Sequence, residues 1–461
     1  MTDITAIFEP IAGAGAVVPA ATLKDRAPGY CAQSREAACL LRPETTEELS
    51  RFMVLAHEHR IGVIPQGGLS GLVDATGAQP DEVAVSLERM AGILRIDPAQ
   101  AIVEVEAGAT LEQIDAALAP HGLMLGVDIP SRGQCTVGGI ISTNAGGIRV
   151  LRYGMTRENV LGLEVVLPDG TILSDMNTLL KNNTGYDLKQ LFIGAEGTLG
   201  IVTRAVLKTV PRPRALACAL LSCPDLEAAQ RALVVARRIA GGHLLSFEAM
   251  WPEYYALTAG GPGMPATPPL PKDAGLYLIL EVEAGDAEAA EALLMTVFEA
   301  TAEEAGVEDG VVAKSEAERK VIWRLREDSD MIGKIMGGTL SYDVSIEAAQ
   351  MKTFVDRWQD ICATRFADLP CFVFGHLGDG NLHVVMAVTP ERKTARADVD
   401  DALYSLVSDI AGSSVSAEHG IGTSKRSAFR QSVPEGRRSM MRRIKQMIDP
   451  AGIMNPRVLF D

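Results

Sequence analysis

The sequence predicts an α+β protein with more than one domain. Stretches with the spacing of strands alternate with stretches that have helical spacing, and glycine-rich turns connect several of them. In the second half this alternation includes a hairpin, which fits a layered α+β fold built on an antiparallel sheet. A chain of 461 residues exceeds what one hydrophobic core usually supports, so two or three domains are expected.

The composition is that of a soluble globular protein, with 47% hydrophobic and 22% charged residues. The net charge of −16 and the lack of a continuous basic run argue against nucleic-acid binding. Seven scattered cysteines without a Cys-x-x-Cys pair indicate a reducing compartment. Neither a signal peptide nor a membrane-spanning segment is recognisable, so we expect a cytoplasmic protein.

The first half begins with a strand at 38–41 and a helix whose start is marked by Thr45 and Glu48, a capping box. The next strand, at 62–65, runs into the turn 66–71. Glycines let a backbone approach a phosphate, and clustered N–H groups bind anions, although a plain tight turn explains this stretch equally well. The Rossmann fingerprint and the Walker lysine loop are absent, which disfavours an ordinary nicotinamide dehydrogenase.

Small residues then dominate one segment of the first half. Strands at 83–87 and 102–106 and a capped helix at 110–119 precede it. Residues 136–147 offer little bulk for a core, but their backbone can lie against a large, flat cofactor. A hairpin with strands at 163–167 and 171–173, and then a glycine turn with a strand at 191–203, complete this half.

The second half starts after a proline linker at 211–213. The elements expected after it are strands at 216–221, 275–282, 339–345, 371–376 and 382–388, and helices at 226–240, 286–303, 313–334, 348–363 and 398–411.

Two histidines, His376 and His383, flank a turn of glycine and aspartate, and Glu418 and His419 stand on a second glycine-rich turn. On one continuous strand the two histidines would face opposite sides, but a hairpin at 378–380 can bring both to one point. Two imidazoles and a carboxylate are a usual ligand set for zinc or another divalent first-row metal. We therefore predict a metal site at His376, His383 and Glu418. Histidines bonded only to backbone are the alternative.

The glycine segments at 65–71, 138–147, 182–187 and 194–203 occur in the order found in FAD-linked oxidases of the vanillyl-alcohol oxidase type. Together with the histidine segment, they make the chain resemble the D-2-hydroxy acid dehydrogenase branch of that family. This branch holds D-lactate and D-2-hydroxyglutarate dehydrogenases and the flavin subunit of glycolate oxidase. The resemblance covers nearly the whole chain.

The resemblance implies three parts. Residues 1–210 would form an FAD-binding domain of two α+β subdomains. Residues 211–415 would form a ferredoxin-like substrate domain on an antiparallel sheet. Residues 416–461 would form a C-terminal segment that returns to the flavin and carries catalytic residues.

The resemblance also implies FAD, with its pyrophosphate on the glycine turn. The residues implied to contact FAD are Gln66, Gly67, Gly68, Leu69, Ser70, Gly71, Pro130, Ser131, Thr136, Gly139, Ser142, Thr143, Gly146, Glu196, Ile201, Val202 and Asn455. Asparagine is common at the position of Leu69, so we expect one lost hydrogen bond and a retained cofactor. Some relatives attach the flavin covalently to a histidine in the glycine turn. This sequence has no histidine between His59 and His121, so FAD is expected to be bound non-covalently.

The chemistry follows from what a 2-hydroxy acid needs. A divalent metal, zinc first and manganese or iron(II) as alternatives, would lower the pKa of the hydroxyl, so that His419 could take its proton. The Cα hydride would pass to flavin N5. The resemblance points to Arg326 as the ligand of the substrate carboxylate, and Asn381 would hydrogen-bond the substrate. An ion pair between Arg326 and Asp330 is the structural alternative.

Hydroxyglutarate enzymes carry a threonine four residues after the arginine that corresponds to Arg326. They also carry a lysine two residues before the aspartate of the next strand. Here these positions are Asp330 and Ser341, which favours a monocarboxylic substrate such as D-lactate. The alternatives are D-2-hydroxyglutarate, a peroxide-producing 2-hydroxy acid oxidase and, remotely, a metal hydrolase. Electron-transfer flavoprotein, a quinone or a cytochrome is expected as the electron acceptor, and a homodimer is expected.

Overall fold

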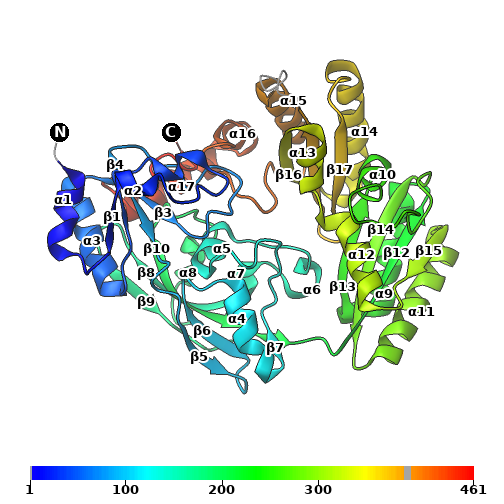
Figure 1. The fold of residues 1–461 in the computed structure, drawn as a ribbon, viewed down its shortest axis with the longest axis horizontal. Helices are drawn as coiled ribbons and strands as arrows, with labels where there is room; N and C mark the ends of the chain where they lie inside the picture. The colour runs from blue at the N-terminus through cyan, green and yellow to red at the C-terminus, as the bar shows by residue number, and fades with distance from the viewer. Residues whose placement is uncertain (1–2, 389–395, 461) are drawn as a thin grey trace. The chain divides into compact units, whose positions relative to one another are not determined.

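The computed structural model describes residues 3–388 and 396–460 (Figure 1). The chain divides into two compact units. The first comprises Met1–Gly147, Tyr153–Arg212 and Glu418–Asp461, and the second comprises Ile148–Arg152 and Pro213–Ala417. The chain passes between the units at 147–148, 152–153, 212–213 and 417–418, and the division into parts at 1–210, 211–415 and 416–461 stays a prediction. The functional roles assigned to these segments stay predictions.

The first unit contains two main sheets. One has the order β1-β2-β4-β3, in which β2, β4 and β3 are parallel and β1 is antiparallel to β2. The other is antiparallel, with the order β5-β6-β10-β8-β9. A short ribbon pairs β11 with β7. The strand bounds are β1 Val17–Pro19, β2 Cys39–Leu41, β3 Gly62–Gln66, β4 Glu82–Ser86, β5 Ile93–Asp97, β6 Ile102–Glu106, β7 Leu123–Met124, β8 Val160–Val166, β9 Ile172–Asp175, β10 Ile201–Lys208 and β11 Val210–Pro211.

Helices of the first unit begin at the predicted caps. Thr110 and Gln113 form a complete capping box. Thr45 Oγ1 accepts a bond from Glu48 N at 3.1 Å, but the Glu48 carboxylate accepts from other amides, so that box is only half formed. The bounds are α1 Ile4–Phe8, η1 Glu9–Ile11, α2 Ala20–Leu23, η2 Ala32–Arg35, α3 Thr46–His59, α4 Leu111–Leu118, η3 Ala119–His121, α5 Val137–Thr143, α7 Thr156–Asn159, α8 Lys189–Phe192, α16 Arg426–Ser432 and α17 Glu435–Ile448.

The second unit is built on an antiparallel sheet with the order β15-β12-β14-β13-β17-β18-β16. The segment β12-α9-β13-α10-β14-α11-β15 contains the βαββαβ order of a ferredoxin-like fold, as expected, and three further strands widen the sheet. The bounds are α6 Val150–Tyr153, β12 Ala215–Cys223, α9 Leu226–Ala240, η4 Gly241–His243, β13 Leu244–Met250, α10 Pro252–Thr258, β14 Leu276–Ala284, α11 Ala287–Ala305, β15 Asp309–Val312, α12 Glu316–Glu327, α13 Asp330–Met336, β16 Thr339–Ser345, α14 Ala348–Arg365, β17 Cys371–His376, β18 Asn381–Ala387 and α15 Arg396–Asp409.

One face of this sheet carries both an apolar core and the polar residues of interest. Tyr254 on α10 stacks on Phe374 of β17, with ring centroids 4.1 Å apart, and Leu325 of α12 is fully buried in the same cluster. Because alternate residues of a strand share a face, His376 lies on the same side as Phe374. The histidine segment is therefore held by a packed core.

One prediction for the second half was wrong. The single helix expected at 313–334 is two helices, α12 and α13, which are separated at Asp328 and Ser329. Side chains of Asp and Ser compete for backbone hydrogen bonds and favour helix ends, which explains the break. Strands β13 and β15 were not predicted.

Among the helices of the described residues, none combines the length and the apolar character that a bilayer crossing requires.

Candidate active site

The glycine turn follows strand β3 in the first unit. Gly68 is required here, because a Cβ atom on it would lie 1.7 Å from the carbonyl oxygen of Gln134. A Cβ atom on Gly67 would lie 2.7 Å from Thr136 Oγ1. The turn thus packs closely on the segment that begins α5, and two groups of residues predicted to bind FAD lie together.

The turn has the features of an anion-binding nest. Within residues 3–388 and 396–460, no protein acceptor is found for the backbone N–H groups of Gly68, Leu69, Ser70 and Gly71. Leu69 has a φ of +56°, a left-handed conformation that asparagine tolerates better than leucine. These free donors fit a pyrophosphate, so the residues present suit FAD. The Gln66 amide instead donates to Ser34 O and Thr76 O and stabilises the turn from within.

The small-residue run is partly helical. Thr136 caps α5 by accepting from Gly139 N at 3.3 Å, and Thr143 Oγ1 donates to Gly139 O at 3.1 Å. Ser142 O accepts from Glu196 N, and Ser131 O accepts from the amides of a tight turn after Pro130. Gly146 is buried next to Gly147. Glycines at the start of α5 keep its surface thin, as contact with a flat cofactor requires.

Glu196 is buried and holds the second glycine-rich turn. Its two carboxylate oxygens accept from Ile421 N at 2.8 Å and Gly422 N at 2.7 Å. Burial raises the pKa of Glu196, although these two N–H donors and Lys425 lower it. A Cβ atom on Gly420 would lie 2.9 Å from this carboxylate, so glycine is needed there. Glu196 therefore positions the segment that carries Glu418 and His419.

The end of the chain is fixed to the same region. Asn455 donates to Ala75 O and to Glu196 O at 2.9 Å, and its amide bonds to Val63 O in strand β3. Arg457 binds Glu82 and donates to Gly77 O. Ile201 and Val202 start β10 and are buried. The C-terminal segment thus lies beside the strand that leads into the glycine turn.

The predicted metal ligands converge. Strands β17 and β18 form a hairpin in which His376 pairs with Asn381 and Phe374 pairs with His383, so the two histidines share one face. Their ring centroids are 5.3 Å apart. Asp379 Oδ1 accepts from Asn381 N, as a turn residue does.

Glu418 follows Ala417, the last residue of the second unit. The N–H of Ala417 donates to Asp343 Oδ2 at 2.9 Å, and Asp343 pairs with His383 across β16 and β18. Ligand atoms of His376, His383 and Glu418 all lie within 4.8 Å of one another. Glu418 Oε1 also accepts from Gly147 N at 2.7 Å. Two imidazoles and a carboxylate at this spacing suit zinc or a similar ion.

Glu248 on β13 is a site residue that the sequence analysis missed. It is 1% exposed, and its carboxylate bonds to His376 Nδ1 and to Arg326 Nε, each at 2.9 Å. Burial raises the pKa of Glu248, but His376 and Arg326 outweigh it and hold this pKa below its ordinary value. A carboxylate behind a ligand histidine fixes the ring and leaves the other nitrogen for the metal. An isolated glutamate within the apolar run 244–250 was the available signal.

Arg326 is buried rather than on the helix surface. Its guanidinium lies over the Phe374 ring, 4.6 Å from the centroid, and its Nη2 is 3.4 Å from His376 Nε2. The ion pair found for it is with Glu248, so the alternative pair with Asp330 is wrong. The bond to Glu248 uses one of its five N–H donors.

Asn381 has unused hydrogen-bonding capacity. Its side-chain nitrogen and oxygen are both buried, and neither has a partner within the described residues. Buried amides are normally satisfied, so this pair of atoms indicates a missing ligand. His419 lies beside Glu418 on the same turn and is partly buried.

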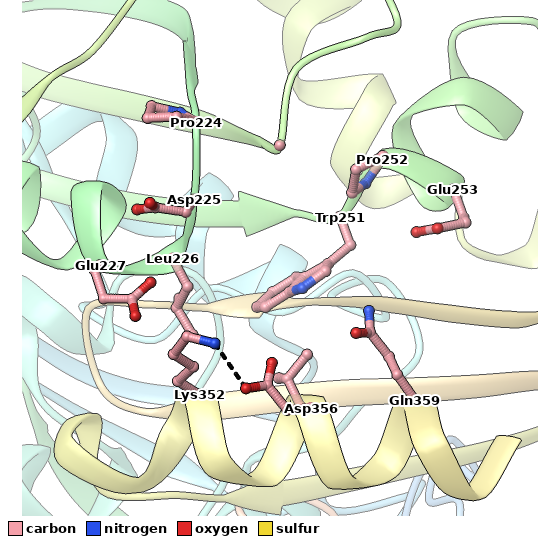
Figure 2. Close-up of a pocket in the computed structure, with 12 residues that line it drawn as sticks. Pro224, Asp225, Leu226, Glu227, Trp251, Pro252, Glu253, Lys352, Asp356 and Gln359 are labelled. Atoms are coloured by element: carbon pink, nitrogen blue, oxygen red, sulfur yellow. Dashed lines mark hydrogen bonds and ion pairs between the residues drawn. The ribbon is translucent and has the colours of Figure 1, made fainter. Parts of the chain in front are cut away.

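A cleft elsewhere in the second unit has no role in this site. Figure 2 shows it with Trp251 at its centre and an ion pair of 2.7 Å between Lys352 and Asp356. Its volume is about 230 Å³, and no predicted site residue lines it.

Comparison with known proteins extends these observations. Residues 37–175 match a model described as FAD binding domain, and residues 212–459 match one described as FAD linked oxidases, C-terminal domain. The chain is 34% identical to a mitochondrial D-2-hydroxyglutarate dehydrogenase of Rattus norvegicus, with 90% of this chain and 77% of that protein covered. It is 33% identical to a D-2-hydroxyglutarate–pyruvate transhydrogenase of Saccharomyces cerevisiae, with 90% and 85% covered.

A solved structure of p-cresol methylhydroxylase with substrate bound shares the fold. Its TM-score is 0.77 at 18% identity, and the match covers 99% of this chain and 96% of that one. The chain belongs to the FAD-linked oxidase family, in the branch of the D-2-hydroxy acid dehydrogenases.

Proposed function

We propose that this chain is an FAD-dependent dehydrogenase that oxidises a short monocarboxylic D-2-hydroxy acid, such as D-lactate, to the 2-keto acid. The observation that carries the proposal is the convergence of His376, His383 and Glu418, beside the buried Arg326 and the unsatisfied Asn381. A metal site next to a guanidinium suits a substrate that chelates through hydroxyl and carboxylate oxygens. Family membership supplies the oxidant.

When bound, FAD accepts the hydride from the substrate Cα, and a divalent ion, zinc in this proposal, lowers the pKa of the substrate hydroxyl. The amides of residues 68–71 hold the pyrophosphate, and His376, His383 and Glu418 hold the ion. Glu248 accepts from Nδ1 of His376, so Nε2 is the nitrogen with which His376 would hold the ion.

The remaining side chains bind the substrate and move its proton. Arg326 binds the carboxylate with donors that Glu248 does not use. The amide of Asn381 donates to a substrate oxygen. His419 takes the hydroxyl proton as a general base, which accelerates such reactions by about 10²–10⁴-fold.

Substrate choice is proposed from two positions. Asp330 is exposed in the first turn of α13, and Ser341 is exposed on β16, two residues before Asp343. Neither offers a cation to a second carboxylate. The double substitution Asp330→Thr with Ser341→Lys should therefore raise kcat/KM for D-2-hydroxyglutarate relative to D-lactate. An unchanged ratio would remove these positions from the proposal.

D-2-hydroxyglutarate is the second candidate substrate, and the name of the rat relative favours it. A peroxide-producing oxidase would differ from the proposed dehydrogenase only in using oxygen as its electron acceptor. Comparing the yield of peroxide with the reduction of a dye distinguishes the oxidase from the dehydrogenase. Membership of a flavoprotein family disfavours a metal hydrolase.

The remaining proposals concern the state of the protein. FAD is non-covalent, so acid precipitation should release the yellow colour into the supernatant. Electron-transfer flavoprotein, a quinone or a cytochrome accepts the electrons, and the chain acts as a homodimer in the cytoplasm. The rat relative is named as mitochondrial, and fractionation of cells tests the location.

Steady-state oxidation of D-lactate with a dye acceptor is the direct test. The purified protein should be active with D-lactate, less active with D-2-hydroxyglutarate and inactive after removal of the metal with a chelator. Activity that survives complete metal removal would refute the metal site.

A further inference from the structure

We propose that Cys362 and Cys371 form a redox-active pair, the dithiol, which hydrogen peroxide oxidises to a reversible disulfide. Both cysteines belong to the second unit, so the inference needs only that unit. It goes beyond the proposed function and does not depend on it. It rests on the contact between the two thiols, on an indole that binds one of them, and on their access to solvent.

The seven cysteines of the chain are all free and fall into two groups. Five are buried, and burial raises the pKa of each of these thiols, so they stay protonated. These five are Cys31, Cys39, Cys135, Cys218 and Cys223. Cys362 and Cys371 are partly exposed instead. Oxidation follows thiolate character and access, so the dithiol is the place where peroxide should react.

The two thiols meet between helix α14 and strand β17. Trp358 and Cys362 are four residues apart on α14 and therefore lie on the same face of that helix. The indole Nε1 of Trp358 donates to the Sγ atom of Cys371, the first residue of β17, at 3.3 Å. This face of α14 is thus turned toward Cys371. Cys362 lies on it one turn after Trp358, and its thiol hydrogen-bonds to Cys371.

This contact makes the two thiols chemically unequal. The hydrogen bond with Cys362 holds the pKa of Cys371 below its ordinary value although burial raises it, and the Trp358 indole lowers it further. The same hydrogen bond, together with burial, raises the pKa of Cys362, which therefore keeps its proton. A redox-sensing cysteine is typically an accessible thiol of low pKa next to a second, resolving cysteine. Cys371 fits the first role and Cys362 the second.

The reaction has two steps. The Cys371 thiolate attacks one oxygen of hydrogen peroxide, so an S–O bond forms, the O–O bond breaks, and hydroxide leaves and takes up a proton to become water. The Cys362 sulfur then attacks the sulfur of this sulfenic acid, so the S–S bond forms and the S–O bond breaks. The leaving hydroxide takes the Cys362 proton and departs as the second water. Two electrons pass from the two thiols to one peroxide.

The surroundings allow the disulfide to form and to be reduced again. Residues 366–370, which connect α14 to β17, belong to neither a helix nor a strand, so the two sulfurs can approach without breaking either element. Partial exposure leaves the disulfide open to attack by a reducing thiol. Disulfides in a reducing compartment are usually transient and serve catalysis or redox sensing. The dithiol fits that use.

Peptide mapping tests the disulfide directly. The folded full-length protein with its bound flavin is treated with hydrogen peroxide, free thiols are blocked with N-ethylmaleimide before unfolding, and the protein is digested with trypsin. Cleavage after Arg365 places Cys362 and Cys371 on separate peptides, which only a disulfide can join. Mass spectrometry should find these two peptides joined, with a mass lower by two hydrogen atoms than their sum. Dithiothreitol should separate them.

Variants of Cys362 test the two roles. Cys362→Ser keeps a hydrogen-bond donor but cannot resolve, so peroxide should leave a sulfenic acid on Cys371 that dimedone traps. Cys362→Ala removes the donor and should slow the alkylation of Cys371 by iodoacetamide at pH 7 by about tenfold, the effect of one pKa unit on the thiolate fraction. A purely structural role for Cys362 would not change this rate.

A matched control keeps the outcome interpretable. Cys223→Ser changes a buried cysteine of the same unit and should form the disulfide as readily as wild type. Far-ultraviolet circular dichroism checks that each variant is folded. The proposal is overturned if peroxide leaves the two peptides unjoined in the wild type, or if it joins other cysteines instead. An alkylation rate of Cys371 that is the same in Cys362→Ala and wild type would also overturn it.

Discussion

Replacing Glu248 by glutamine should damage both stability and metal affinity. Glu248 is 1% exposed and binds two partners that are themselves buried, His376 and Arg326. The neutral amide keeps the size of the side chain but leaves the guanidinium of Arg326 as an uncompensated buried charge. Breaking a buried ion pair from one side costs about 3–5 kcal/mol. Losing the carboxylate behind a ligand histidine costs about 10–100-fold in metal affinity.

Urea unfolding of the apo protein measures the first effect, and titration with zinc measures the second. Glu316→Gln is a matched control in the same unit, because it removes the exposed ion pair between Glu316 and Arg319, whose nitrogen and oxygen lie 2.8 Å apart. Surface pairs contribute about 0–1 kcal/mol, so this control should unfold almost like wild type. If Glu248→Gln behaves like the control in both assays, Glu248 does not support the site as described.

Three further predictions follow from local geometry. Leu69→Asn should raise the free energy of unfolding by about 1 kcal/mol, because the left-handed φ of Leu69 is unfavourable for leucine. The control Leu72→Asn changes an exposed leucine that has no positive φ and should leave the free energy of unfolding unchanged. Thermal unfolding measures both variants. The folded-state pKa of Glu196 lies above its ordinary value. The protonated Glu196 side chain therefore contributes stability at low pH, and this contribution is lost as the pH rises through the folded-state pKa. In Glu196→Gln, the free energy of unfolding should fall less steeply with pH than in wild type. His419→Ala should slow flavin reduction by about 10²–10⁴-fold while the bound flavin absorbance is unchanged, and rapid reduction in this variant would refute its role as base.

Local patterns predicted many elements of the second unit. The helix at 226–240 and the strands at 339–345 and 371–376 have the predicted bounds, because strong periodicity and clear ends specify them locally. Strand β13 was missed because a glutamate interrupts its short apolar run and a glycine pair precedes it. Tertiary pairing with β14 and β17 makes it a strand.

Long-range partners could not be predicted. Glu248 and Arg326 are 78 residues apart, and Glu196 and Ile421 are 225 apart, so no spacing rule connects them. The hairpin between His376 and His383 could be predicted, because a glycine turn reverses the chain within seven residues. The sequence therefore indicated the residues that would bind the metal and the substrate. The fold revealed the buried carboxylates, Glu196 and Glu248, that hold these residues in place.

We expect this chain to oxidise a D-2-hydroxy acid with the help of bound flavin and a divalent metal ion. The most direct test is anaerobic mixing of the purified protein with D-lactate, L-lactate or D-2-hydroxyglutarate, with and without prior chelation, while the flavin absorbance is recorded. We predict rapid bleaching by D-lactate, slower bleaching by D-2-hydroxyglutarate, none by L-lactate, and loss of bleaching after chelation that added zinc restores. Bleaching that is indifferent to the metal, or no bleaching by either D-acid in the metal-loaded protein, would contradict the claim.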